Sequence, residues 1–278
     1  MGLIKGLNTA LAVAALGYGA AAVGLYAFQD RLIYFPDPEV TATPAALGLA
    51  YDSVIFTAAD GVTLHGWYLP ADPKQPTVLF CHGNAGNIGN RLVFIDHWRR
   101  RGLGVLLFDY RGYGQSQGRP SEAGLYRDAA AAWRFLTRDK RVAPGDIVVY
   151  GRSLGGAVAA HLAGHVPKTP KALVLDSSFT SLAAVATRLY PWLPVERLLR
   201  HRYPTAENLQ KVEAPVLILH SRDDELIPMA MGEALYSLAP QPKALVALRG
   251  SHDGVVRDST EALFDGLAAF LADLAPGD

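Results

Sequence analysis

Short apolar runs alternate with helix-like stretches over most of the chain. Eight runs rich in Val, Leu, Ile and Phe are predicted to be strands, at 52–57, 63–69, 77–81, 104–108, 147–150, 172–175, 216–220 and 244–248. The later runs are continuously apolar, as in strands that are buried on both faces. Helical patterns are predicted between them, at 90–101, 121–137, 154–164 and 259–274. This alternation predicts an α/β fold whose mostly parallel eight-stranded sheet carries helices on both faces.

The two ends of this pattern differ from its middle. The first two strands are joined by the turn sequence AADGV, so we expect them to form an antiparallel hairpin. Between 177 and 214 the alternation stops, and prolines divide the segment into two or three short helices. We interpret 177–214 as a small helical cap over the carboxyl edge of the sheet. In this cap Tyr190, Trp192 and Leu193 either line a substrate pocket or only pack the cap together.

The amino end carries an uncharged apolar run at 10–28, which as a helix would be roughly 30 Å long, the thickness of a bilayer core. We therefore divide the chain into an anchor at 1–30, a linker at 31–50 and an α/β domain at 51–278. A signal peptide cleaved near the small residues 20–22 and a buried core helix are the alternatives. Lys5 and the terminal amine favour a cytoplasmic amino end, with the domain on the other side of the membrane, although Arg31 follows the run.

Composition excludes several classes of protein. Lys+Arg and Asp+Glu both number 26, so nothing indicates the basic surface that nucleic-acid binding needs. The single cysteine, Cys81, lies in an apolar run and is expected to be a buried small side chain. No histidines, cysteines or acids show the spacing of metal ligands. We therefore expect no metal and no cofactor.

A serine between glycines gives the sequence its first chemical signal. In VVYGRSLGG, a strand-like run passes through Ser153 directly into an alanine-rich helical stretch. A turn this tight exposes the serine hydroxyl, and it needs small residues two positions away on each side, here Gly151 and Gly155. The pattern predicts a nucleophilic serine.

A nucleophilic serine needs a base and an acid that orients the base. Two acids, Asp223 and Asp224, follow the strand at 216–220, and His252 follows the last strand. His252 is expected to take the Ser153 proton. Asp176, at the end of another strand, is a further candidate for the acid.

Two backbone N–H groups are expected to bind the oxyanion of the reaction. Leu154 begins the helix after the serine, where unsatisfied donors favour negative charge. Asn84 lies in the loop CHGNAGN after the third strand and is the candidate for the second donor. In the loop FDYRGYG we expect Asp109 and Arg111 to form a structural ion pair.

Taken together, the segments CHGNAGNIGNR, FDYRGYGQSQGRPSEAGLYRDA, GRSLGG, DSSFTSL, RDDELIP and GSHDG resemble the membrane-anchored α/β-hydrolase-domain serine hydrolases. The resemblance extends from about residue 32 to the end and implies the α/β-hydrolase fold. It also implies a triad of Ser153, Asp224 and His252, because the family's acid stands four residues before a proline, here Pro228. Ser221 departs from the glycine that relatives often have.

The resemblance implies hydrolysis of carboxylic esters or thioesters, on small-molecule or lipid substrates. Some relatives act on lysophospholipids, and others remove palmitoyl groups from proteins. Two other functions compete with this one. A peptidase could use the same fold, and a catalytically silent, membrane-anchored module could bind an apolar ligand. An intact Ser, Asp and His set favours an enzyme.

Overall fold

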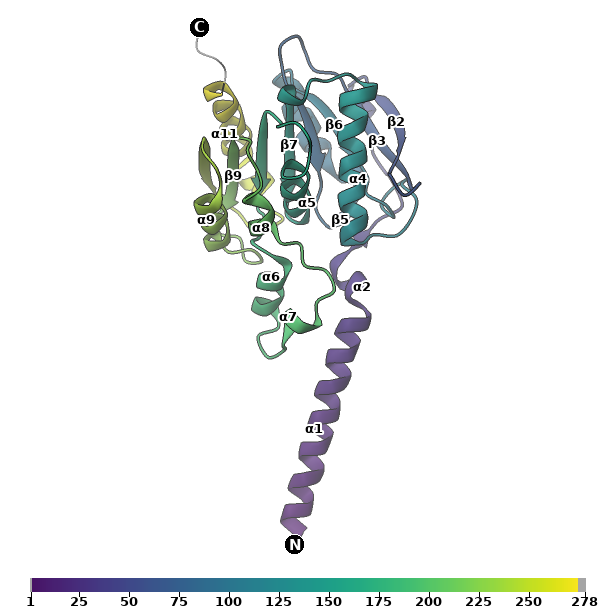
Figure 1. Ribbon diagram of the computed structural model, residues 1–278, viewed down its shortest axis with the longest axis vertical. Coiled ribbons are helices and arrows are strands. Elements are labelled where there is room, and N and C mark those ends of the chain that lie inside the picture. The colour runs from purple at the N-terminus through teal and green to yellow at the C-terminus, as the bar shows by residue number, and fades with distance from the viewer. Residues whose placement is uncertain (1, 275–278) are drawn as a thin grey trace.

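The computed structural model describes residues 2–274. An eight-stranded sheet forms its centre, in the order β10-β9-β8-β7-β4-β6-β3-β2 (Figure 1). The strands are β2 (Asp52–Thr57), β3 (Thr63–Leu69), β4 (Thr77–Cys81), β6 (Gly104–Phe108), β7 (Ile147–Arg152), β8 (Ala172–Asp176), β9 (Val216–Ser221) and β10 (Lys243–Leu248). β2 pairs with β3, and β3 with β6, in antiparallel fashion, while the remaining pairs are parallel. The mostly parallel sheet with an antiparallel hairpin at its edge is thus confirmed.

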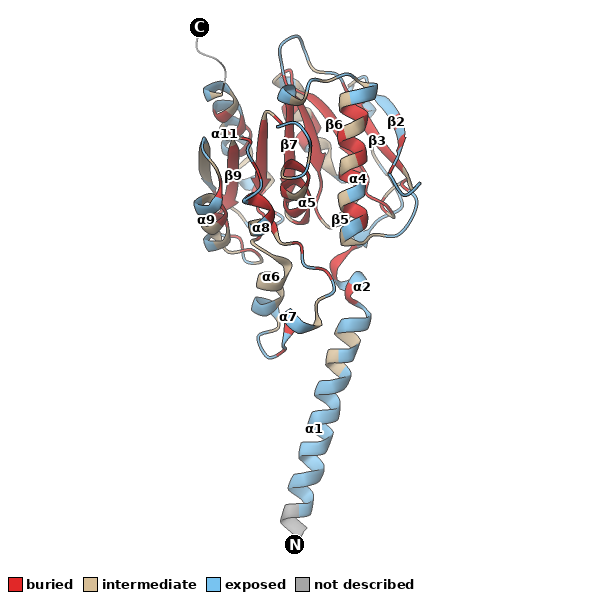
Figure 2. Ribbon diagram, in the orientation of Figure 1, coloured by how far each residue is buried: buried red, intermediate tan, exposed pale blue. Residues whose placement is uncertain are grey.

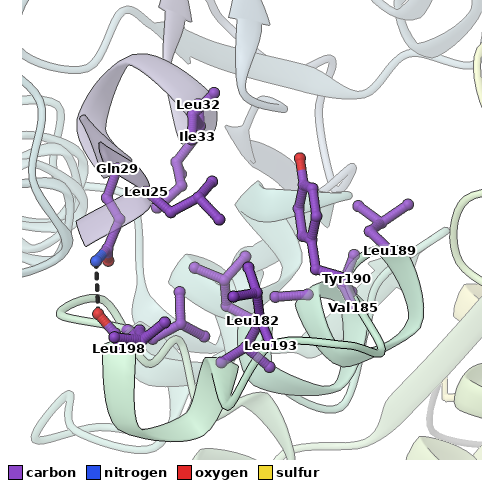
Figure 3. A pocket seen from close by; sticks show the side chains of 13 residues that line it. Leu25, Gln29, Leu32, Ile33, Leu182, Val185, Leu189, Tyr190, Leu193 and Leu198 are labelled. Carbon is purple, nitrogen blue, oxygen red and sulfur yellow. Dashed lines mark hydrogen bonds between the residues drawn. The ribbon is translucent and has the colours of Figure 1, made fainter. Parts of the chain in front are cut away.

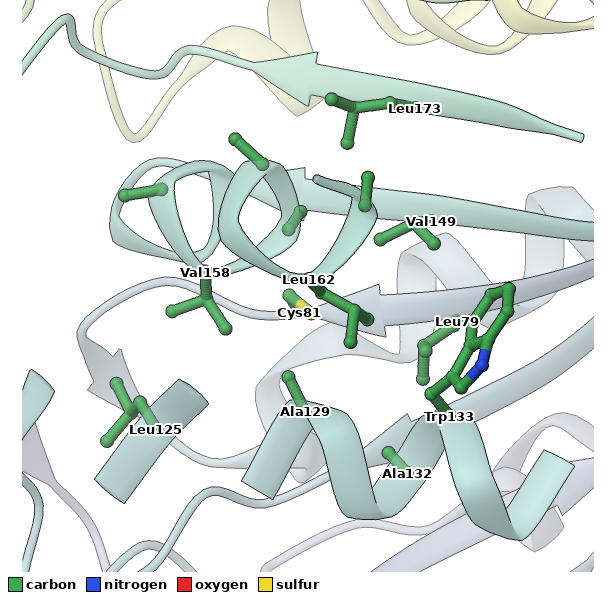
Figure 4. Close-up of a cluster of buried hydrophobic side chains, with 14 of the residues drawn as sticks. Leu79, Cys81, Leu125, Ala129, Ala132, Trp133, Val149, Val158, Leu162 and Leu173 are labelled. Carbon is green, nitrogen blue, oxygen red and sulfur yellow. The ribbon is translucent and has the colours of Figure 1, made fainter. Parts of the chain in front are cut away.

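Helices cover both faces of the sheet. α4 (Glu122–Arg134) and α5 (Leu154–Ala163) pack on one face, and α3 (Leu92–Arg100) and α11 (Thr260–Asp273) on the other. Successive strand residues serve opposite faces, so that Val149 belongs to the first core and Val148 to the second. The first core is tight because α4 and α5 present many alanines to it (Figure 4). Cys81 lies buried in this core, as expected.

Several shorter elements complete the domain. One helix that the sequence pattern did not indicate is α9 (Met229–Leu238), which follows β9. Four further short helices are α10 (Val255–Asp258), η2 (Ile88–Arg91), η3 (Phe135–Asp139) and η4 (Pro144–Asp146). Between β8 and β9 the segment predicted as a cap forms α6 (Leu182–Leu189), α7 (Val195–Leu198) and α8 (Thr205–Leu209). Ser181 is the N-cap residue of α6, and its hydroxyl accepts a hydrogen bond from the Ala184 N–H at 3.1 Å.

The amino-terminal helix α1 (Gly2–Ala27) projects away from the domain (Figure 1). Its segment Lys5–Ala27 has a mean hydropathy of 1.7 and is long and apolar enough to cross a membrane. Its side chains are largely exposed, in contrast to the buried strands (Figure 2). This exposure contradicts the alternative of a buried core helix.

The segment interpreted as a linker is fastened to the domain. The short helix α2 (Gln29–Ile33) follows α1, and β1 (Phe35–Pro36) then pairs with β5 (Ala85–Gly86) next to the loop after β4. The buried Tyr34 hydroxyl is hydrogen-bonded at 2.7 Å to the hydroxyl of Tyr203 from the cap segment. The short helix η1 (Pro44–Leu47) completes this segment. The end of α1 is therefore held against the carboxyl edge of the sheet.

Candidate active site

The turn between β7 and α5 forces Ser153 into a strained backbone conformation. Its φ of 53° and ψ of −121° lie in a region that residues other than glycine rarely adopt. A Cβ atom at Gly151 would overlap the Gly155 carbonyl, which explains why the turn needs a glycine at position 151. The constraint on Gly155 is different, because its Cβ would overlap the carbonyl oxygens of Cys81 and His82 at the end of β4.

We expect Gly155→Ala to destabilise the protein by about 3 kcal/mol, because the overlapping atoms belong to the backbone of a buried strand and cannot move aside. Thermal unfolding of the variant and the wild-type protein measures the effect. Gly145→Ala is the matched control, because a Cβ at Gly145 has nothing within 4 Å. Equal melting temperatures for all three proteins would show that α5 does not pack against the end of β4 as described.

Ser153, His252 and Asp224 form one hydrogen-bonded chain. The Ser153 Oγ lies 3.0 Å from the His252 Nε2, and the His252 Nδ1 lies 2.7 Å from the Asp224 Oδ2. The serine comes from the β7–α5 turn, the acid from the loop after β9 and the histidine from the loop after β10. Three loops at the carboxyl edge of the sheet thus bring together residues that are far apart in the sequence.

The surroundings of Asp224 favour its ionised form. Its Oδ1 accepts hydrogen bonds from the N–H groups of Leu226, at 3.0 Å, and Ile227, at 2.7 Å. Burial alone would raise the pKa of Asp224, but the hydrogen bond and charge of His252, with the Ile227 N–H, outweigh it and keep this pKa below its usual value. An ionised Asp224 fixes the His252 proton on Nδ1, so that Nε2 is free to accept the serine proton.

The two other candidate acids have different partners. Asp223 is half-exposed and accepts hydrogen bonds from Arg249, at 3.1 Å, and from the Gly250 N–H, at 3.2 Å. Asp176 is buried and accepts hydrogen bonds from the Tyr150 hydroxyl at 2.8 Å and from Arg152 at 2.9 Å. In this geometry the acid that reaches His252 is Asp224.

Arg152 is a positioning residue that the sequence argument missed. One of its guanidinium nitrogens donates to Asp176, and the other donates to the backbone carbonyl of His252 at 2.8 Å. The N–H of His252 donates to the Glu225 carboxylate at 3.1 Å. These contacts hold the backbone of His252 in place from two sides. The one local signal was the position of the arginine, directly before the serine in GRSLGG.

The loop that carries Asn84 is fixed by its own polar groups. The Asn84 side chain donates a hydrogen bond to the Ile33 carbonyl at 2.9 Å. The backbone carbonyl of Asn84 accepts a hydrogen bond from the Tyr113 hydroxyl at 2.8 Å. Asn84 lines the same cleft as Ser153 and His252, a hollow of about 410 Å³. Leu154 is the first residue of α5, so its N–H lies at the amino end of that helix.

Beneath this loop lies a buried pair, His82 and Asp109. The Asp109 carboxylate accepts the Ile88 N–H at 3.0 Å, and burial raises its pKa to about 7. Burial lowers the pKa of His82 to about 3, so His82 is neutral at neutral pH. The His82 Nε2 lies 3.7 Å from the Asp109 Oδ1, and the two side chains therefore do not form an ion pair at that pH. The expected ion pair between Asp109 and Arg111 is wrong, because Arg111 binds other carboxylates, those of Asp60 and Asp128.

A second, apolar pocket of about 130 Å³ lies between the end of α1 and the cap (Figure 3). Leu25 and Ile33 line it from one side, and Val185, Tyr190 and Leu193 line it from the cap. The pocket shares no lining residue with the cleft at Ser153, but the hydrogen bond from Asn84 to Ile33 connects their walls. Trp192 does not line it. Its indole is 55% exposed and packs edge-on against Tyr18 of α1.

Within residues 2–274 there is no cluster of three or more His, Cys, Asp or Glu residues that could hold a metal ion. The cleft presents the side chains of Ser153 and His252. A hydroxyl, an imidazole and an ionised carboxylate in this order are suited to nucleophilic attack on a carbonyl group.

Comparisons with known proteins agree with this fold. Residues 72–207 match the family model described as Serine aminopeptidase, S33. An uncharacterized protein of Mycobacterium tuberculosis, Rv2307c, is 40% identical over 268 residues, which is 95% of each chain. The α/β hydrolase domain-containing protein WAV2 of Arabidopsis thaliana is 35% identical, over 82% of each chain. The chain therefore belongs to the α/β-hydrolase family, and it is a hydrolase by fold and family.

Two further comparisons concern the membrane and the fold. The uncharacterized membrane protein YNL320W of Saccharomyces cerevisiae is 34% identical, over 84% of this chain and 86% of the yeast protein. Among solved structures, the Pyrococcus furiosus esterase Pf2001 superposes with a TM-score of 0.72, covering 87% of this chain and 98% of the esterase at 21% identity. At that identity the similarity establishes the α/β-hydrolase fold and leaves the substrate open.

Proposed function

We propose that this protein is a membrane-anchored serine hydrolase that cleaves carboxylic ester or thioester bonds through an acyl-enzyme. The observation that carries the proposal is the unbroken hydrogen-bonded chain from the strained Ser153 through His252 to Asp224. A hydroxyl held clear of the sheet, with an oriented base beside it, is the arrangement that acyl transfer needs. It supports an active enzyme over a silent ligand-binding module.

The reaction follows from the positions of these groups. Ser153 Oγ attacks the carbonyl carbon while His252 Nε2 takes its proton, and the N–H groups of Leu154 and Asn84 bind the resulting oxyanion. His252 then returns the proton to the departing alcohol or thiol, leaving the acyl group on Ser153. A water molecule, deprotonated by His252, attacks the acyl-enzyme in the second half of the cycle and releases the acid. Asp224 remains ionised throughout and stabilises the imidazolium.

A peptidase is the second candidate, because the matching family model is described as a serine aminopeptidase. An aminopeptidase must bind the ammonium group of its substrate. The cleft at Ser153 is lined by Arg91, Arg152 and one carboxylate, Asp253. Arg152 is paired with the buried Asp176, which balances its charge. The Arg91 guanidinium lies near Asp253 and opposes binding of an ammonium group there, so the cleft favours a neutral substrate over a free amine.

Matched substrates distinguish the two activities. We expect the purified full-length protein to hydrolyse an ester and a thioester of the same acyl chain and to leave aminoacyl anilides intact. A series of acyl lengths then measures the chain that the site prefers. Efficient hydrolysis of the aminoacyl anilides without hydrolysis of the esters would contradict the esterase proposal and indicate an aminopeptidase.

The apolar helix α1 supports the anchoring part of the proposal. Its segment Lys5–Ala27 is about 34 Å long as a helix, enough to cross a hydrocarbon core of about 30 Å. The yeast relative YNL320W is described as a membrane protein, which also supports it. We further propose a non-cytoplasmic catalytic domain, from Lys5 before the apolar run at 10–28, although Arg31 follows it.

A further inference from the structure

Residues 189–195, which include the last residue of α6, the first residue of α7 and the connection between them, form an uncharged and partly exposed apolar segment. Its sequence, LYPWLPV, lies between the charged residues Arg188 and Glu196. Leu189 is 51% exposed and Trp192 is 55% exposed. We call this segment, residues 189–195, the cap tip. Large exposed side chains of this kind on a short loop need a partner or an apolar environment.

The cap tip lies beside α1, well before the end of that helix. The Tyr18 hydroxyl donates to the Trp192 carbonyl at 3.2 Å, and the two rings meet edge to face with their centroids 6.2 Å apart. Tyr18 precedes Ala27 by nine residues, which corresponds to about 13 Å along the helix. If α1 crosses a bilayer up to its last turn, this depth places Trp192 below the lipid headgroups.

The contact between α1 and the cap is reinforced at the upper end of the helix. Gln29, which is buried, donates to the Leu198 carbonyl at 2.6 Å and accepts the Arg200 N–H at 2.8 Å. Asp30 accepts hydrogen bonds from Arg200, at 3.2 Å, and from His201, at 2.7 Å. These bonds hold the cap and the end of α1 together, so the cap tip cannot leave the membrane while α1 stays in it.

The charged residues near the carboxyl end of α1 indicate the level of the membrane surface. Arg200 lies over the ring of Tyr26, at 5.6 Å from its centroid, and pairs with Asp30. Arg31 lies over the ring of Phe28 at 5.7 Å. Arginines that lie over aromatic rings at the end of an apolar helix are typical of the membrane interface. Below this level the cap tip carries no charge.

We propose that the cap tip is embedded in the same bilayer leaflet as the carboxyl-terminal half of α1, with Trp192 among the lipid acyl chains. This inference rests on the proposed membrane anchor. It also names a substrate class, because the apolar pocket between α1 and the cap then opens toward lipid. The substrate is a long-chain ester or thioester whose acyl chain lies in that leaflet, and the pocket, at about 130 Å³, receives part of that chain.

Tryptophan fluorescence tests the position of the cap tip in the intact protein. The chain has four tryptophans, and Trp67, Trp98 and Trp133 are at most 4% exposed. Trp192 is therefore the tryptophan that lipid can reach. The full-length wild-type protein and Trp192→Phe are reconstituted into phosphatidylcholine vesicles whose acyl chains carry bromine, a contact quencher. We expect quenching in the wild-type protein and loss of most of it in Trp192→Phe.

Equal quenching in the two proteins would overturn the proposal, and so would its absence from both. Flotation of the same vesicles on a density gradient separates this failure from failure of the anchor. If the protein floats and Trp192 is not quenched, α1 is an anchor but the cap tip lies outside the lipid. A second copy of the chain that covers the cap tip would give this result. If the protein does not float, the anchor itself is wrong.

The substrate class has its own test in Trp192→Glu. A carboxylate at the cap tip opposes burial in lipid, but position 192 lines neither the cleft nor the apolar pocket. We expect turnover of a long-chain ester embedded in vesicles to fall about tenfold, with turnover of a soluble short-chain ester unchanged. Equal effects on the two substrates, or no effect on either, would contradict the proposal.

Discussion

Replacing Ser153 with alanine should lower ester turnover by about 10⁴–10⁶-fold, since the residues of a triad act as a unit. The substitution removes the nucleophile and leaves the hydrogen bond between His252 and Asp224 intact. His252→Ala should have an effect of similar size, and the double variant should lose little more. Initial rates on a soluble ester, with melting temperatures to establish that each variant is folded, measure these effects.

Ser237→Ala is the matched control for this experiment, because the Ser237 hydroxyl bonds only the Glu233 carbonyl on the exposed side of α9. We expect its turnover to equal that of the wild-type protein. A loss of only tenfold in Ser153→Ala would mean that another residue carries the reaction.

Asp224→Asn should lower turnover by about 10⁴-fold without unfolding the protein. The amide has the shape of the carboxylate, but its NH₂ group can donate to His252 Nδ1 and so stabilise the tautomer with its proton on Nε2. In that tautomer the nitrogen that faces Ser153 can no longer accept its proton. The loss should appear in kcat.

Asp223→Asn is the control that separates the two neighbouring acids. Asp223 pairs with the exposed Arg249 side chain, and an exposed ion pair contributes about 0–1 kcal/mol. Its loss should therefore leave turnover close to that of the wild-type protein. If Asp223→Asn abolished activity and Asp224→Asn preserved it, the assignment of the acid would be reversed.

The sheet could be predicted from the sequence because its strands are buried runs of apolar residues. The predicted boundaries at 150, 175 and 220 fall short of the observed ends Arg152, Asp176 and Ser221, because the last residues of these strands are polar or glycine and break the apolar pattern. The helix α9 escaped prediction for a related reason. Of its residues, Gly232 and Leu235 are the buried ones, so its apolar stripe is weak.

The proposed triad could be located because each member follows a strand, and parallel strands end at the same edge of a sheet. Contacts between distant segments could not be predicted in this way. No local spacing connects Arg152 with the carbonyl of His252, or Tyr18 with Trp192. The error at Arg111 has the same origin, since one of its partners, Asp60, lies in the turn between β2 and β3 and the other, Asp128, lies on α4.

Labelling with a fluorophosphonate probe tests the central claim most directly, since the probe forms a covalent bond only with an activated serine hydroxyl. Our account predicts one adduct on the full-length protein, located at Ser153 by mass spectrometry of its peptides and absent from Ser153→Ala. An adduct at a different serine, or undiminished labelling of Ser153→Ala, would contradict it.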